Sequence, residues 1–191
     1  KNFWYEKFVH ISPYKKTSFI NKKVDIKKIE RKINFKISEN QNFIEYSPLG
    51  LKYLKDIFKL IKKNNGGLLI IDYGYFTEKM ENTLQAIYKK KKSKVLENIG
   101  KSDITYNLNF YLIKKIAENF RELKVNFTSQ KNFLTNLGIH QRAEIISKNK
   151  TFTEKADIFY RLKRLVDKKE MGDLFKVMLI KNSDNNFQIG F

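Results

Sequence analysis

An uninterrupted apolar run at residues 68–71 (LLII) sets the strongest limit on how this chain can fold. Apolar runs without polar alternation are typical of strands that are buried on both faces, as in a parallel sheet. An asparagine and two glycines precede the run, and they end a segment (51–61) whose apolar residues recur at three- and four-residue steps. Ser47 suits the N-cap of this helix and Pro48 its first position. A helix, a glycine stop and a buried strand together predict an α/β fold.

The rest of the chain is interpreted from the same kinds of pattern. Alternation in the first forty residues, clearest at Ile33, Phe35 and Ile37, predicts short antiparallel strands joined by polar turns. Beyond Tyr75 we expect an irregular stretch as far as Asn107. The sequence then predicts helices at 109–122, 130–136, 139–149 and 153–168, and strands at 124–128 and 174–180. The inward residues of the last helix are expected to be Ala156, Phe159, Tyr160 and Leu162.

Composition excludes several classes of protein. The 191 residues include no cysteine, which rules out disulfides, cysteine-bound zinc, iron–sulfur clusters and a thiol nucleophile. His10 and His140 are far apart in the sequence, so we expect no metal site. An apolar content of 41% excludes a disordered chain. No apolar run approaches the ~20 residues of a membrane helix, so we expect no membrane span.

The net charge of +19 does not by itself identify a partner. Lysine supplies 34 of the 39 basic residues, and lysine, isoleucine and asparagine are all read from A/T-rich codons, so genome composition can supply most of the excess. Nucleic-acid sites rely on arginine for bidentate contacts, and arginine is scarce here. We therefore expect no nucleic-acid partner, with a functional basic surface as the alternative.

The end of the predicted strand carries the best candidate site. Ligands of open α/β sheets lie beyond the carboxyl ends of the strands, and this strand ends in Asp72, Tyr73, Gly74 and Tyr75. Gly74 would let the backbone turn sharply or approach a ligand closely. The alternative is a turn in which the Asp72 carboxylate accepts backbone amides and the two tyrosines cover the sheet edge.

Several short segments form an ordered set along the chain. They are Glu45-Tyr46-Ser47-Pro48, residues 68–75 (LLIIDYGY), Thr83-Leu84-Gln85-Ala86, Gly100 with Asp103-Ile104-Thr105 and Asn109-Phe110, Ser129-Gln130 with Arg142, and residues 171–177 (MGDLFKV). The set resembles the MidA family of class I S-adenosylmethionine-dependent methyltransferases, whose mitochondrial members are assembly factors for respiratory complex I. Asn107 and Asn109 stand where the family usually has histidine and aspartate, and Lys131 replaces a glycine.

The resemblance implies the C-terminal part of a class I methyltransferase, which is a Rossmann-like α/β sheet with an antiparallel β insertion and helical insertions. It places residues 1–191 in a single partial domain, with the β-rich insertion at 1–44 and the last strands and helices of the sheet at 45–191. The family's glycine-rich cofactor loop and ribose-binding acid would precede Lys1. We therefore expect S-adenosylmethionine as the cofactor, no cofactor-binding residue in this chain, and no activity from these residues alone.

The resemblance further implies protein arginine methylation, with a respiratory complex I subunit as the protein substrate. The expected catalytic residue is Asp72, and the expected substrate-binding residues are Tyr73, Gly74, Tyr75, Gln85 and Asp103. The implied compartment is the bacterial cytoplasm or, in a eukaryote, the mitochondrial matrix, and the oligomeric state is left open. The alternative function is a non-catalytic protein- or RNA-binding module derived from the same fold.

Overall fold

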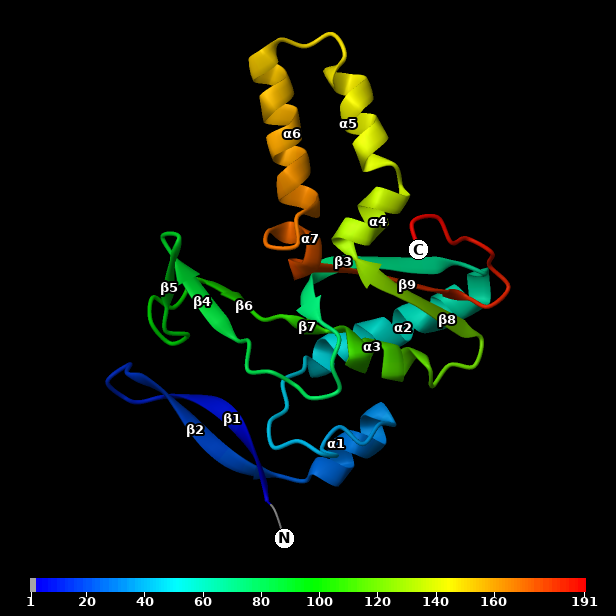
Figure 1. The fold of residues 1–191 in the computed structure, drawn as a ribbon. Helices are drawn as coiled ribbons and strands as arrows, with labels where there is room; N and C mark the ends of the chain where they lie inside the picture. Colours follow the sequence, from blue (N-terminus) through cyan, green and yellow to red (C-terminus); the bar gives the residue numbers. More distant parts are fainter. Residues whose placement is uncertain (1–2) are drawn as a thin grey trace. The chain divides into compact units, whose positions relative to one another are not determined.

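The computed structural model describes residues 3–191 and divides them into two compact units (Figure 1). The first unit consists of the chain up to Tyr46 together with residues 79–107, and the second consists of residues 47–78 and 108–191. Each unit is therefore assembled from two separate stretches of sequence. The chain passes from one unit to the other three times.

A mixed four-stranded sheet forms the centre of the second unit. Its strands are β3 (Gly67–Tyr75), β7 (Leu108–Asn109), β8 (Leu123–Ser129) and β9 (Phe175–Asn182), in the order β7-β3-β9-β8. β9 runs antiparallel to both β3 and β8, so these two strands are parallel to each other with the last strand between them. β7 pairs in parallel with the end of β3. The sheet confirms the predicted α/β class, and the strands expected at 124–128 and 174–180 are confirmed as β8 and β9.

β3 is less buried than its apolar sequence predicted. The side chains of Leu69 and Ile71 are 45% and 49% exposed, whereas β9 is buried from Val177 to Asn182. The expectation of a strand covered on both faces is thus wrong for β3 and describes β9 instead. Burial alternates along the first part of β3, because side chains of a strand point to opposite faces, and Leu69 and Ile71 share the exposed face.

Two helices cover one face of this sheet. α2 (Pro48–Asn64) begins at its expected N-cap, where Ser47 Oγ accepts a hydrogen bond from the Gly50 amide at 3.0 Å, and it ends at Asn65 in the left-handed conformation. α3 (Phe110–Ala117) is shorter than predicted and follows the N-cap Asn109. The largest fully buried side chains of this unit come from these two helices and β9, namely Phe58, Phe110, Ile116, Met178, Ile180 and Val177.

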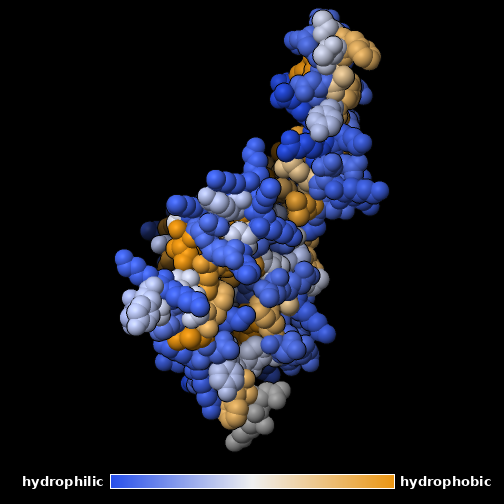
Figure 2. Space-filling view, turned by 90° about the vertical axis from the view of Figure 1, so that its left-hand side faces the viewer, coloured by the Kyte–Doolittle hydropathy of each residue, from blue (hydrophilic) through white to orange (hydrophobic). Residues whose placement is uncertain are grey.

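The four helices between β8 and β9 form a projecting arm. They are α4 (Gln130–Asn136), α5 (Ile139–Ser147), α6 (Phe152–Val166) and α7 (Met171–Leu174), and α5 and α6 make a helical hairpin (Figure 1). No residue of α6 is buried, and Figure 2 shows orange hydrophobic side chains exposed along the hairpin. The expectation that α6 turns Phe159 and Tyr160 inward is wrong, since they are 44% and 66% exposed, and Ala156 is exposed as well. Leu162 is partly buried.

The capping box at the start of α6 gives the hairpin a pH-dependent contribution to stability. The Glu154 carboxylate accepts hydrogen bonds from the Thr151 amide and hydroxyl, both at 2.9 Å, and pairs with Lys150 at 3.0 Å. These contacts, the Thr151 amide first, lower the pKa of Glu154 to about 2 from its ordinary value of 4.5. Because the pKa is lower in the folded protein, the contribution is complete above pH 4.5 and is lost as the pH falls through about 2.

Replacing this carboxylate by an amide tests the linkage. We expect Glu154→Gln to lower the melting temperature near neutral pH and to lose less stability on acidification than the unchanged protein, because the amide does not titrate. Melting curves recorded by circular dichroism at pH values from neutral down to about 2 measure the difference, with Glu144→Gln on α5 as the matched control. Identical pH profiles for Glu154→Gln and the unchanged protein would contradict the assignment.

The first unit begins with a β-hairpin and a short helix. β1 (Trp4–Ile11) pairs antiparallel with β2 (Thr17–Val24), which confirms the strands expected at the start of the chain. The strand expected at Ile33, Phe35 and Ile37 is wrong. Residues 26–33 form helix α1 (Ile26–Ile33), which the Asp25 carboxylate caps and which ends at Asn34 in the left-handed conformation. The alternation at 33–37 has another cause. The chain leaves the helix at Asn34, and both Ile33 and Ile37 are buried.

A three-stranded sheet completes the first unit. It consists of β4 (Gln85–Tyr88), β5 (Lys91–Ser93) and β6 (Asp103–Thr105), in the order β5-β4-β6. The stretch expected to be irregular therefore contains antiparallel strands, each too short to show a period in the sequence. Burial, followed by the charge of Glu6, raises the pKa of the Tyr46 phenol in this unit. Among residues 3–191, no helix is long and apolar enough to cross a membrane.

Candidate functional site

The carboxyl end of β3 brings Asp72 into a row of polar residues across three strands. Asp72 is paired with Lys176 of β9, and Lys176 is paired with Ser129 at the end of β8. Residues paired across neighbouring strands share a face, so the three side chains lie side by side on one face of the sheet. Sequence analysis did not identify Lys176 or Ser129 as site residues. In the sequence these two residues were marked only by their positions near the ends of the strands predicted at 124–128 and 174–180.

The Asp72 side chain is partly buried, and one of its two carboxylate oxygens accepts a hydrogen bond within the described residues. Its Oδ1 accepts a hydrogen bond from the Tyr73 amide at 2.8 Å. Lys176, its cross-strand neighbour, instead donates from Nζ to the carbonyl of Asp173. Asp72 Oδ2 accepts no hydrogen bond from the part of the chain that the structure describes. This oxygen is therefore available to a cationic or hydrogen-bond-donating ligand.

The neighbouring tyrosines lie on the opposite face of the sheet from Asp72. Side chains alternate along a strand, so Asp72 and Gly74 share one face while Tyr73 and Tyr75 share the other. The Tyr73 ring packs edge-on against Phe175, with centroids 5.8 Å apart. Tyr75 is paired in register with Asn109 of β7. The tyrosines thus flank the strand end on a different face from the carboxylate.

Close packing explains why a glycine occupies position 74. β3 ends at Tyr75, as expected, but it continues through Gly74, so the backbone makes no sharp turn there. A Cβ atom at Gly74 would lie 2.3 Å from the Leu108 carbonyl oxygen and 2.8 Å from the Phe110 ring. Glycine is therefore required because the chain itself, in β7 and α3, approaches this position closely.

Asn109 has a structural role: its side chain makes two hydrogen bonds within the fold. Its Oδ1 accepts from the Leu112 amide at 3.0 Å and caps α3, while its Nδ2 donates to the Thr77 carbonyl at 3.1 Å. The residue is 6% exposed. An amide supplies both an acceptor and a donor without placing a charge in this buried position.

The remaining predicted residues, Gln85 and Asp103, lie together in the first unit. Gln85 starts β4 and pairs with Thr105, and Asp103 starts β6 and pairs with Ile87. Their side chains share one face of this small sheet on a diagonal between adjacent strands. The structure therefore groups the candidate residues into two sets, Asp72 to Tyr75 in one unit and this pair in the other.

A carboxylate that sequence reasoning did not select fixes the start of β4. Glu45 accepts hydrogen bonds from the amides of Thr83 and Leu84, at 3.1 and 3.0 Å, and from the Thr83 hydroxyl. Thr83 Oγ1 in turn accepts from the Asn107 amide at 2.8 Å. This cluster ties together three segments of the first unit and sets the position of Gln85. Its only sequence signal was the similarity of residues 45–48 and 83–86 to family motifs.

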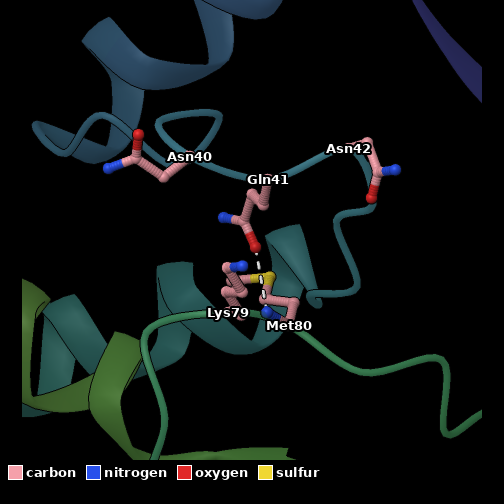
Figure 3. Close-up of a pocket in the computed structure, with 5 residues that line it drawn as sticks. All are labelled: Asn40, Gln41, Asn42, Lys79 and Met80. Carbon is pink, nitrogen blue, oxygen red and sulfur yellow. Dashed lines mark hydrogen bonds between the residues drawn. The ribbon is translucent and has the colours of Figure 1, made fainter.

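A shallow pocket of about 350 Å³ lies in the same unit. Its lining is made of Asn40, Gln41, Asn42, Lys79 and Met80 (Figure 3). Gln41 points across it, and its Oε1 accepts from the Met80 amide at 2.9 Å. The pocket contains none of the predicted site residues. Residues 3–191 also contain no cluster of three or more histidine, aspartate or glutamate side chains that could hold a metal ion.

Three glycines lie in or next to β3. Gly66 and Gly67 lie at the amino end of β3, away from the end where ligands of such sheets lie. The space beside Gly74 is filled by Leu108 and Phe110, so it does not cradle a ligand. The sequence contains no G-x-G-x-x-G motif.

Comparison with solved structures shows which fold the chain has. Two crystal structures of COG1565 superfamily proteins from Burkholderia thailandensis match 98% of this chain, with TM-scores of 0.77 and 0.76 and sequence identities of 20% and 19%. One of them, described as a "likely methyl transferase", is bound to S-adenosyl-homocysteine. These matches show that the chain shares the α/β fold of the two proteins.

The family follows from the sequence comparison. A family described as "Putative S-adenosyl-L-methionine-dependent methyltransferase" matches residues 1–128. The chain belongs to this family, the MidA methyltransferases, and the family's cofactor is S-adenosylmethionine. The rat mitochondrial protein arginine methyltransferase NDUFAF7 is 27% identical over 108 residues. The chain spans about half the length of the two solved relatives (51% and 49%) and the match covers 24% of the rat protein.

Proposed function

We propose that this chain forms the substrate-facing part of a protein arginine methyltransferase. The observation that carries the proposal is the Asp72 carboxylate, which lies at the carboxyl end of β3 with Oδ2 open to a ligand. Similarity to the rat protein arginine methyltransferase supports an arginine as the methylated group. The resemblance to the MidA family points to a respiratory complex I subunit as the protein that carries it.

A carboxylate suits this substrate for two reasons. A guanidinium group is always protonated near neutral pH, so its nitrogen lone pair is poorly available for attack. An aspartate can hold one edge of the planar fork, align one nitrogen and accept a proton as the new bond forms. Alignment is the larger contribution, since proximity and orientation can supply ~7–11 kcal/mol in favourable cases. In this proposal Asp72 performs both tasks.

The other candidate residues contribute substrate contacts in the proposal. Tyr73 and Tyr75 offer aromatic surface on the opposite face of β3, against which a substrate side chain can pack. Gln85 and Asp103 present an amide and a carboxylate on one face of the small sheet in the first unit. These polar side chains suit contacts with the backbone and basic side chains of a protein substrate.

A methyl-transfer assay tests the proposal. The full-length gene product is incubated with S-adenosylmethionine labelled in its methyl group and with an extract containing complex I subunits, and hydrolysed protein is then analysed for methylarginine. We expect labelled methylarginine in one protein. Residues 1–191 alone are expected to give none and not to bind the cofactor, because their sequence contains no glycine-rich cofactor motif. Absence of methylarginine with the full-length protein would contradict the proposal and favour a non-catalytic docking module.

A further inference from the structure

The β1–β2 hairpin is an exposed surface that the proposed function does not use. Its eight residue pairs form a two-stranded sheet on their own, and thirteen of the sixteen strand residues are exposed. One face carries four large side chains with at least 44% of their surface exposed, namely Tyr5, Val9, Ile11 and Phe19. A two-stranded hairpin is marginally stable in water without a covered face. A partner that covers this face would therefore stabilise the hairpin.

The charge of the hairpin limits what that partner can be. Residues 3–24 contain five lysines, one glutamate and no arginine, which gives a net charge of +4. A second copy of the chain would bring the same positive charge to the contact, within a total of +19 on each chain, and would be repelled. Charge complementarity instead favours a partner with acidic side chains.

The arrangement of the lysines favours a protein over a nucleic acid. Lys23 Nζ lies 3.6 Å from the centroid of the Phe3 ring, and Lys22 Nζ lies 4.8 Å from that of Phe8. Bases of single-stranded nucleic acids bind by stacking on open aromatic faces. Here the chain's own ammonium groups already occupy one face of each ring, through cation–π contacts. The same lysines remain suited to pairing with carboxylates.

The geometry of the hairpin indicates how such a partner binds. Among the described residues neither β1 nor β2 pairs with a strand on its outer side, so each outer edge offers backbone donors and acceptors. An extended peptide can add to such an edge, with main-chain hydrogen bonds giving affinity and alternate side chains giving specificity. We infer that the β1–β2 hairpin is a docking surface for an extended acidic segment of a protein partner, which adds as a third strand to the outer edge of β2, beside Phe19, Lys22 and Lys23.

The test uses the full-length gene product and a labelled peptide of alternating glutamate and valine, about twelve residues long, which is enough to span a strand of this length. Fluorescence anisotropy is expected to show binding that weakens with added salt. The double variant Lys22→Glu/Lys23→Glu is expected to bind roughly tenfold more weakly, because two exposed attractions become repulsions. Lys91→Glu/Lys92→Glu is the matched control, since it reverses two adjacent exposed lysines on β5 of the same unit and should change little.

Four results would overturn the inference. They are equal weakening by the control variant, binding of an oligouridylate in preference to the acidic peptide, failure of the peptide to bind, and hydrogen exchange showing that β1 and β2 are already protected in the free full-length protein. New protection of β2 amides upon peptide addition supports strand addition. The assay contains no S-adenosylmethionine, so its outcome is independent of whether the protein methylates arginine.

Discussion

Asp72→Asn is expected to lower methyl transfer by the full-length protein ~10²–10⁴-fold, the range found when a positioned acid or base is removed. The amide keeps the size of the side chain and can still accept from the Tyr73 amide, as Asp72 Oδ1 does at 2.8 Å. It cannot balance the charge of a guanidinium or accept its proton. Affinity for the cofactor is expected to be retained, because the proposal places Asp72 against the substrate and not against the cofactor.

The measurement compares the rate of methylarginine formation with the dissociation constant for S-adenosylmethionine in each variant. Asp56→Asn is a suitable control, because it removes the same charge from an exposed residue of α2 in the same unit. Unchanged turnover in Asp72→Asn would show that this carboxylate only orders the strand end. Parallel losses of turnover and folded protein would likewise assign it a structural role.

Gly74→Ala is expected to destabilise the second unit by ~1–3 kcal/mol, the usual cost of forcing extra atoms into a packed interior. The added methyl group would lie 2.3 Å from the Leu108 carbonyl oxygen, and a backbone atom cannot rotate away. Either β7 must separate from the end of β3 or the Phe110 ring must move from its fully buried position. For a chain of this size each kcal/mol corresponds to roughly 2–4 °C in melting temperature.

Gly67→Ala provides the matched control on the same strand. A Cβ atom there would lie 3.6 Å from its nearest neighbours, Leu179 and Ile180 among them, which is ordinary van der Waals contact. We expect little change in the free energy of unfolding, or a gain of ~0.4–1 kcal/mol because alanine restricts the unfolded chain. Chemical denaturation of both full-length variants measures the difference. Equal losses at the two positions would show that the close approach at Gly74 carries no special cost.

The sequence was most informative where the local signal and the tertiary environment agree. Ser47, Pro48 and Asn65 mark both ends of α2, and the structure places those ends as predicted. Capping and the left-handed stop act within a few residues, so the sequence contains the whole interaction. Asp72 could be placed at the end of a strand for the same reason, because the apolar run before it is local.

The errors arose where burial depends on distant residues. An apolar face along α6 predicted an inward orientation for Phe159 and Tyr160, but periodicity identifies the face and not what covers it. The same reason explains Leu69 and Ile71, whose apolar character does not tell which strand of the sheet is central. β9 became the doubly covered strand because the last segment of the chain inserts between β3 and β8.

Sequence alone thus determined the α/β class, the helix before β3, the carboxylate that follows its apolar run and the similarity to a methyltransferase family. Only the tertiary structure decided that Asp72 shares a cross-strand row with Lys176 and Ser129, and that Glu45 fixes the start of β4. These contacts join residues far apart in the chain. Their formation depends on strand order and register, which are set by the burial of the whole sheet and not by any local pattern.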